Sequence, residues 1–479
     1  LFRSWAFTQF AGTVYWDKAG VVSTSSKPVL YDSFAFWDRD QKTAEAKSLP
    51  EKLRPIALKP AAERTPEEAE QLKRHFLEFG YVASNDRVRT LKKQADDAKS
   101  KADGIRSAAP TTLDFKEAKE AKPAYLLTRG EYDQKGDAVA RATPAVLPSL
   151  PAGTPNNRLG LAKWLTAESH PLTSRVTVNR IWQQFFGTGL VKTTEDFGSQ
   201  GEQPTHPLLL DWLSSEFMTP KIAGAAHKWD VKHLVKLIVM SATYRQTAHV
   251  LPNEYEIDPE NRFLARGPRY RLDAEVLRDQ ALAVSGLLVD RVGGPSVKPP
   301  QPDGLWFAVG YSGSNTVRFK QDDGHKKVHR RTLYTFIKRT APPRQMSTFD
   351  ALSRESCVVR RERTNSPLQA LLLMNDPQYV ECARSLAERS MTEVGSSSAD
   401  RARFILRQCV LRSPTETEVQ DLVADYEENL SDYKANPEAA KKLVSIGEVP
   451  PNAELPQDEL AAWTLVANLV LNLDEVINK

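Results

Sequence analysis

Cysteine is scarce in this sequence of 479 residues, which contains only Cys357, Cys382 and Cys409. None of the three belongs to a C-x-x-C pair or to the C-x-x-C-H motif that attaches haem c. An odd number leaves at least one thiol unpaired within the chain, and free cysteine is often simply a small buried residue. We therefore expect no cofactor in this chain.

Long apolar runs and a strong charge bias are also missing. No apolar stretch reaches the roughly 18–20 residues that a membrane-spanning helix needs, so we expect no membrane span. The net charge is only +4, and the basic residues are not interleaved with aromatic residues that would stack on bases, so nucleic acid is not an expected partner. The sequence begins at Leu1 without a signal-peptide pattern, and we interpret it as a piece of a larger product.

The standard catalytic signatures are absent as well. The sequence contains no G-x-S-x-G, no H-E-x-x-H, no P-loop and no G-x-G-x-x-G after a predicted strand. Its eight histidines are scattered; His325 and His329 lie at helical spacing, but they flank two lysines in a predicted loop. The sequence therefore indicates no metal site and leaves enzymatic activity undecided.

The sequence does contain many signals for the starts and ends of helices. Its length suits two or three domains, and its 41% hydrophobic and 26% charged residues are ordinary for a globular protein. We predict a mainly α fold: a multi-helix domain, a helical hairpin and a short N-terminal remnant of a β-sandwich. The predicted order is the end of a sandwich (1–27), a linker and hairpin (28–110), an extended, proline-rich connector (111–155) and a helical C-terminal domain (156–479).

The predicted hairpin carries a recognisable apolar pattern. Thr65, Pro66 and the two following acids form a helix start, and Gly80 ends that first helix. The apolar residues of the second helix recur at alternating steps of three and four, which is a short, alanine-rich heptad seam. The seam consists of Val88, Leu91, Ala95, Ala98, Ala102 and Ile105.

Arginines concentrate in residues 338–377 and supply most of the candidate ligand-binding residues. Guanidinium groups bind carboxylate, sulfate or phosphate with two hydrogen bonds, so Arg354, Arg360, Arg361 and Arg363 could hold an anionic ligand. The alternative is an internal network with nearby acids. These acids are Asp350, Glu355, Glu362 and Asp376.

Two further groups complete the candidate sites. Asn179 belongs to a polar helix stripe, and with its neighbour Arg180 it joins the ligand-binding candidates. Glu195 and Asp196 in a glycine-rich loop, together with Asp350, are the candidate catalytic acids. Two such acids brought together in a cleft could act as acid and base or bind Ca²⁺, whereas the alternative is that they cap helices and pair with arginine.

Several long motifs, found in order along the chain, resemble a known family. They are NRLGLAKWL (157–165), VNRIWQQFFGTGLVKTTEDFGSQGEQPTHPLLLDWL (178–213), WDVKHLVKLIVMSATYRQ (229–246) and RRERTNSPLQALLLMNDPQYV (360–380). They resemble the C-terminal domain of large secreted proteins that are abundant in Planctomycetes, with the resemblance covering about residues 120–479. Those proteins pair a cytochrome c module with two domains of unknown function, sometimes with a lectin-like sandwich between modules. Residues 1–23 resemble the tail of that sandwich.

The resemblance implies export to the periplasm or cell surface and a tie to polysaccharide use or electron transfer. It implies haem c in a part of the protein outside this sequence. It also implies that other chains or fragments of the same large protein are partners, and that polysaccharide is a ligand. Our leading hypothesis is a non-catalytic binding and assembly module. The alternatives are a hydrolase or lyase acting on acidic or sulfated polysaccharide, and a scaffold for a cytochrome c module.

Overall fold

The computed structural model describes residues 31–81, 86–109, 111–118, 120, 122–129, 132–310, 313 and 316–479, with side chains omitted for 86–89. The strands predicted in residues 1–27 lie outside this part of the chain. Within it the protein is mainly α, as predicted, with a single two-stranded sheet. The chain divides into unit 1, Leu1–Ala121, and unit 2, Lys122–Lys479. The boundary falls inside the segment that we predicted to be a connector.

Unit 1 contains a small helical core. Its helical elements pack around Trp37, Leu72 and Phe76. The predicted start of α3 is formed by a reciprocal capping box between Thr65 and Glu68, which satisfies otherwise unpaired backbone N–H groups. The elements are α1 (Phe34–Thr43), α2 (Arg54–Leu58), η1 (Ala61–Glu63), α3 (Pro66–His75) and the π-helical turn η2 (Phe76–Gly80).

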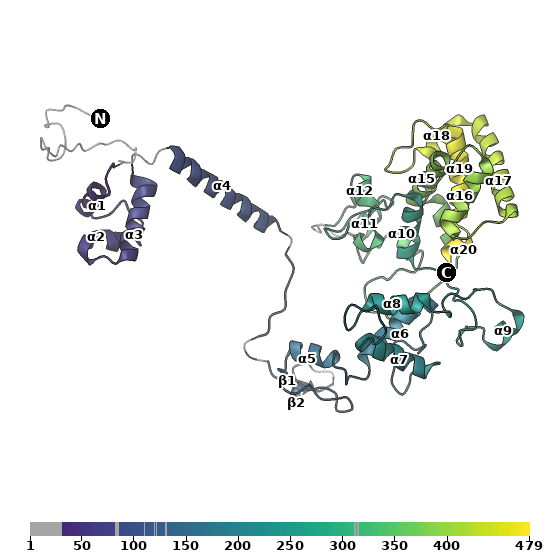
Figure 1. The fold of residues 1–479 in the computed structure, drawn as a ribbon, viewed down its shortest axis with the longest axis horizontal. Coiled ribbons are helices and arrows are strands. Elements are labelled where there is room, and N and C mark those ends of the chain that lie inside the picture. The colour runs from purple at the N-terminus through teal and green to yellow at the C-terminus, as the bar shows by residue number, and fades with distance from the viewer. Residues whose placement is uncertain are drawn as a thin grey trace. The chain divides into compact units, whose positions relative to one another are not determined.

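The second predicted helix of the hairpin is α4 (Asp86–Ala108). Near its start, Lys92 pairs with Glu78 at 2.5 Å and lies 4.1 Å from the centre of the Phe79 ring. Beyond that point α4 extends away from α1–α3 as a single rod (Figure 1). From Leu91 onward every residue of α4 except Lys92 is exposed.

The first half of unit 2 leads from the sheet into a compact group of helices. Strands β1 (Ala124–Leu127) and β2 (Lys135–Val139) pair antiparallel. Of the five helices that follow, the second, third and fourth bury an aromatic and aliphatic cluster that includes Val178, Trp182 and Leu234. The five helices are α5 (Arg158–Leu165), α6 (Thr173–Phe186), α7 (Pro207–Met218), α8 (Val231–Met240) and α9 (Pro252–Ile257).

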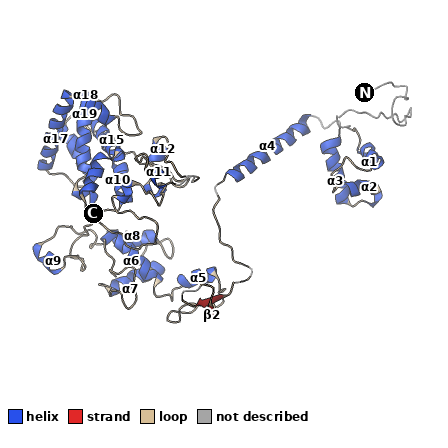
Figure 2. Cartoon of the chain, turned by 180° about the vertical axis from the view of Figure 1, so that it is seen from behind, coloured by secondary structure: helices blue, strands red, loops and turns tan. Residues whose placement is uncertain are grey.

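The second half of unit 2 is a larger helical assembly, seen from behind in Figure 2. Its centre is α19 (Gln457–Leu471), whose Trp463 is fully buried and stacks on Tyr426. The longer helices around it are α10 (Ala274–Ser285), α14 (Pro367–Asn375), α15 (Pro377–Glu393), α16 (Ser398–Val410), α17 (Glu416–Ala435) and α18 (Pro437–Val444). The shorter ones are α11 (Leu305–Val309), α12 (His325–Val328), η3 (Thr332–Tyr334), α13 (Arg344–Ser347) and α20 (Asp474–Ile477).

A buried polar group stabilises this assembly. Glu381 of α15 is 1% exposed, and it accepts hydrogen bonds from His329 at 3.0 Å and from the backbone N–H groups of Glu448 and Val449 at 2.9 and 2.8 Å. Burial disfavours the charged carboxylate, but these hydrogen bonds outweigh it and hold the pKa of Glu381 below its ordinary value. Glu381 therefore joins α15 to two distant loops.

The helices were also compared with the requirements for crossing a membrane. Among the described residues, none of the helices combines the length and the apolar character that crossing a bilayer requires.

Candidate functional site

Asp350, a candidate catalytic acid, has a carboxylate that is fully occupied by structural contacts. It accepts hydrogen bonds from the backbone N–H of Thr364 at 2.8 Å and from the Thr364 hydroxyl at 2.9 Å, and it pairs with Arg271. Its backbone has φ +58°, in the left-handed region. These contacts close the loop between α13 and α14, which points to an architectural role.

Two arginines of the same loop pair with acids that are distant in the sequence. Arg360 donates to Glu195 at 2.6 Å, and Arg361 binds both oxygens of Glu275 at 2.5 and 3.0 Å. Burial disfavours ionisation of Glu275, but Arg361 outweighs it and lowers the pKa of that carboxyl. The loop therefore pairs with helix α10 and with the glycine-rich loop after α6.

Four other predicted site residues have separate surroundings. Asn179 is fully buried and bonds the backbone of Val191 twice, donating at 3.0 Å and accepting at 2.8 Å. Arg180, the next residue on α6, is exposed, as is Arg354. Asp196 accepts the N–H of Gly198 at 2.7 Å, which closes a turn in the glycine-rich loop. Across the described residues, no three His, Cys, Asp or Glu side chains gather as metal ligands would.

A pocket in unit 2 has a volume of about 460 Å³ and opens at the end of α6. Of the predicted site residues, only Arg363 lines it. The remaining walls come from residues 186–192 and from the segment that includes α9 and continues to Tyr270. Its volume lies within the range of roughly 300–1,000 Å³ that is usual for small-ligand sites.

Gly187, Tyr270 and Arg363 build one wall of this pocket. Gly187 ends α6 with φ +81°, and a Cβ atom there would lie 2.8 Å from the Tyr270 ring. Arg363 places its guanidinium carbon 4.4 Å from the centre of that ring and donates to the Gly187 carbonyl at 3.2 Å. The Tyr270 hydroxyl donates to the carbonyl of Gln184, and burial raises the pKa of Tyr270 to about 12. The phenol is therefore neutral and firmly held.

The charges of the pocket are mostly positive. Its lining includes Lys192, Arg266, Arg269 and Arg363 against one acid, Glu260. Lys192 binds Glu260 at 2.7 Å, and Arg269 pairs with Asp474 outside the pocket. Arg266 and Arg363 form no ion pair with an acid among the described residues, so the pocket carries uncompensated positive charge.

Arg266 is the more buried of these two cations. The residue is 6% exposed, and its Nη2 donates to the carbonyls of Asp258 and Pro259 at 2.9 and 3.0 Å. Its Nη1 is buried without a hydrogen-bond partner in the described part of the chain. A buried guanidinium with unused donor capacity strengthens the attraction of the pocket for an anion.

The sequence predictions missed most of this pocket. Its wall from Asn261 to Tyr270 was not singled out, although the short segment ENRFLARGPRYR places arginines beside aromatic residues and a Gly-Pro pair. Gly267 is needed there because a Cβ atom would lie 2.5 Å from the carbonyl oxygen of Gln246. The alternation of arginine with aromatic residues and glycine was the signal that could have found the site.

Comparison with known proteins identifies a family. The model of a family described as PSD1, protein of unknown function (DUF1553), matches residues 157–426, more than half of the chain. This range includes every residue that lines the pocket. No curated protein matches the sequence, and no solved structure matches it.

Proposed function

Since the chain belongs to the PSD1 family of unknown function (DUF1553), we propose a function from its own residues: a non-catalytic module that binds negatively charged carbohydrate. The ligand would occupy the pocket at the end of α6. The observation that carries this proposal is the uncompensated charge of Arg266 and Arg363 in a pocket with aromatic walls.

The choice of an anion rests on charge. Four cations face one acid across the lining, and that acid is already bound by Lys192. A carboxylate or sulfate group could accept hydrogen bonds from Arg363 without displacing an acid from it. The same charges would repel a cationic ligand.

The choice of carbohydrate rests on shape and on the exposed ring at the rim. Tyr255 of α9 lines the pocket and is 59% exposed, so its ring is free to stack on a flat, partly apolar ligand face. An open pocket of about 460 Å³ with an exposed aromatic residue suits a short segment of a longer polymer. Uronic acid or sulfated sugar residues combine the required charge with such a face.

Binding without turnover is supported by the state of the acids. Acid–base cleavage of a sugar chain by the usual route needs two carboxyl groups on either side of one bond. The one acid in the pocket lining is Glu260, which forms an ion pair with Lys192. The carboxylate of Asp350 is already bound by Thr364 and Arg271. The alternative, a hydrolase or lyase acting on acidic or sulfated polysaccharide, would need another group to act as acid or base.

The setting of the proposed module follows from the family resemblance. We propose that the chain works outside the cytoplasm, in the periplasm or at the cell surface, as part of a larger protein whose other fragments are its partners. A role as scaffold for a cytochrome c module is the remaining alternative. Fractionation of cells with an antibody against unit 2, and haem staining of the co-purified chains, test these two statements separately.

Calorimetric titration of the full chain with oligosaccharides of equal length tests the binding proposal. The set contains a uronic acid polymer, a sulfated polymer and a neutral polymer. We expect the two acidic ligands to bind and the neutral one to bind at least about tenfold more weakly, since one lost charged hydrogen bond is worth roughly 1.5–3 kcal/mol. Equal affinity for all three would overturn the proposal, and new chain ends in the acidic samples would favour the enzymatic alternative.

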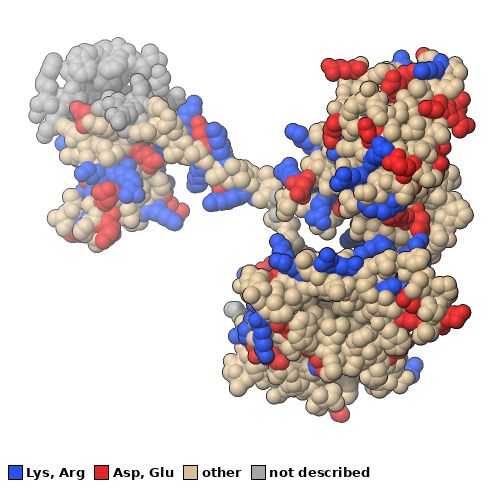
Figure 3. Space-filling model, turned by 45° about the vertical axis from the view of Figure 1, so that its right-hand side comes forward, with Lys and Arg blue, Asp and Glu red and all other residues tan. Residues whose placement is uncertain are grey.

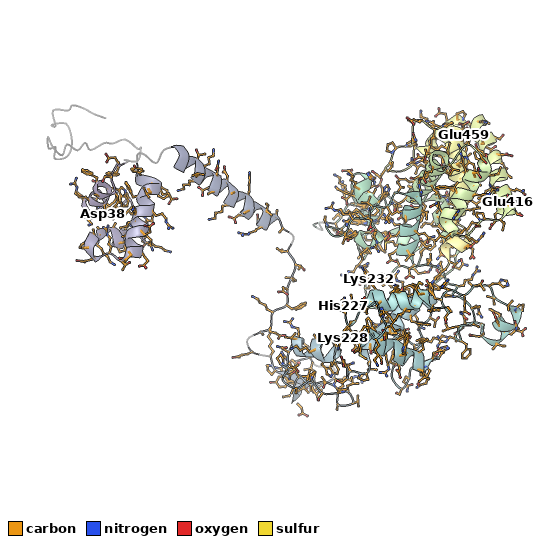
Figure 4. All side chains as sticks on the ribbon, viewed as in Figure 1. Asp38, His227, Lys228, Lys232, Glu416 and Glu459 are labelled. Atoms are coloured by element: carbon orange, nitrogen blue, oxygen red, sulfur yellow. The ribbon has the colours of Figure 1, made fainter. Side chains whose placement is uncertain are left out.

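Variants locate the binding to this pocket. Arg363→Gln removes a pocket charge and should weaken binding about tenfold. Lys232→Gln removes the same charge from an exposed lysine of α8 that does not line the pocket; Figure 4 labels it near Lys228. The Lys232 variant should bind like the parent protein. Equal losses in the two variants would mean that the ligand responds to overall charge.

A further inference from the structure

The helix α4 exposes an apolar seam. Leu91 and Ile105 are 56% and 73% exposed, and the three alanines between them on the seam are exposed as well. Apolar residues at alternating steps of three and four normally face another helix. The seam therefore lacks a covering partner among the described residues, although α4 has the length of several turns.

The residues beside the seam carry one sign of charge. With Leu91 at position d of the heptad, Lys99 and Arg106 occupy position e, and Lys101 occupies position g. The aspartates lie away from the seam, on the outer positions, at Asp96, Asp97 and Asp103. Lys and Arg stand out along the rod of α4 in Figure 3, with acidic residues between them. The seam is thus flanked by positive charge on both sides.

Existing contacts use only part of this charge. Lys92, also at position e, is engaged with Glu78 and Phe79 at the base of the helix. Arg106 has a 3.4 Å contact with Asp103, with both side chains well exposed, which contributes little. Lys99 and Lys101 form no ion pair within the described part of the chain. Positions e and g normally pair with opposite charges on the neighbouring helix, so these two lysines indicate an acidic partner.

We propose that α4 docks a single helix of another polypeptide, with large aliphatic residues in its core positions and Asp or Glu at its flanking positions. The small alanines Ala95, Ala98 and Ala102 let the two backbones approach closely, so leucine-sized residues of the partner fill the space beside them. Leu91 and Ile105 seal the two ends of the contact. Charge selects the partner, and apolar contact holds it.

A second copy of α4 does not fit this surface. In a parallel pair Lys101 would face Arg106 of the other copy, and in an antiparallel pair like positions would again meet, basic against basic. The acidic helix α17 of the same chain does not fit either, because its apolar residues Val419 and Leu422 are already buried in unit 2. Repulsion of this kind excludes wrong partners as effectively as attraction selects the right one.

Binding of designed helical peptides to the full chain tests the proposal. One peptide has leucine in its core positions and glutamate at its flanks; a second is identical except for lysine at the flanks. Fluorescence anisotropy should show that the glutamate peptide binds at least about tenfold more tightly. Equal binding of the two peptides, or binding of neither, would overturn the proposal.

Variants make the test specific to the seam. The double variant Lys99→Glu, Lys101→Glu should reverse the preference, so that the lysine peptide binds more tightly. Lys93→Glu changes the same charge on the outer face of α4 and should leave the preference unchanged. Ile105→Gln should weaken both complexes, with helicity measured by circular dichroism to show that α4 is intact. Reversal by Lys93→Glu alone would contradict the proposed geometry.

Self-association is the remaining outcome. If sedimentation shows that the chain forms a dimer that Ile105→Gln dissociates, the seam is covered by a second copy and our choice of partner is wrong. We expect the chain to remain monomeric through α4 at all accessible concentrations.

Discussion

The guanidinium of Arg363 lies 4.4 Å from the centre of the Tyr270 ring and donates a 3.2 Å hydrogen bond to the carbonyl of Gly187. These residues come from the end of α6, the segment before α10 and the loop before α14. Their contact joins the two halves of unit 2 at the wall of the pocket. Its integrity therefore affects both the stability of unit 2 and the binding that we propose.

Gly187→Ala should destabilise the protein and distort the pocket. The backbone at Gly187 has φ +81°, and the new methyl group would lie 2.8 Å from the Tyr270 ring. Left-handed backbone alone costs a non-glycine residue about 1–3 kcal/mol, and the clash adds to it. Urea unfolding and ligand titration measure the two effects.

A matched control separates backbone strain from the clash. Gly153 has φ +74°, but a Cβ atom there would meet nothing within 4 Å. The Gly153→Ala protein should therefore lose only the stability that the strained backbone costs, and it should keep full ligand affinity. Equal destabilisation by the two substitutions would mean that the contact with Tyr270 relaxes without cost.

Asp350→Asn should lower stability while leaving ligand binding in place. The substitution removes the charge that Arg271 pairs with and one acceptor that Thr364 uses, at a cost of about 1–3 kcal/mol for partly buried groups. Asp196→Asn is the control, because among the described residues its carboxylate accepts a hydrogen bond only from the N–H of Gly198. Abolished ligand binding or abolished turnover in a stable Asp350→Asn protein would restore this acid as a functional residue.

Glu381→Gln should be among the most damaging single changes in unit 2. Breaking a buried charged pair by removing one partner costs about 3–5 kcal/mol, and Glu381 lies 3.9 Å from the guanidinium of Arg384, with both side chains 1% exposed. Glu416→Gln removes an exposed carboxylate that binds Arg403 and should cost less than about 1 kcal/mol. Figure 4 labels Glu416 beside α17, at the outer side of the assembly. Chemical unfolding monitored by tryptophan fluorescence compares the two.

Glu381 also makes the stability of the protein depend on pH. The folded pKa of Glu381 lies below its ordinary value of 4.5, so the folded state binds fewer protons there than the unfolded state. Its contribution is fully present above pH 4.5 and is lost as the pH falls through the lower folded pKa. The unfolding midpoint should drop steeply below pH 4.5 in the parent protein and less steeply in Glu381→Gln. Parallel curves for the two proteins would assign the acid sensitivity to other groups.

Local features of the fold were predictable, and distant pairings were not. The start of α3 at Thr65 depends on residues within one turn, so the sequence pattern was sufficient. The heptad pattern of α4 was readable for the same reason. Pairing of Glu195 with arginine was one of the predicted alternatives, but Glu275 was not predicted as a partner of Arg361, because this acid is brought to the loop only by the packing of α10. The pocket was missed since its walls come from segments more than 90 residues apart, at Tyr270 and Arg363.

Calorimetric titration with one oligosaccharide in sulfated and desulfated form tests whether the pocket recognises its ligand by negative charge. Backbone, length and stacking faces are then identical, and only the negative charge differs. We expect that the sulfated form binds at low salt and that the desulfated form binds at least about tenfold more weakly. The difference should shrink at about 1 M salt, where charges are screened beyond roughly 3 Å. Equal affinity of the two forms at low salt would contradict recognition by charge.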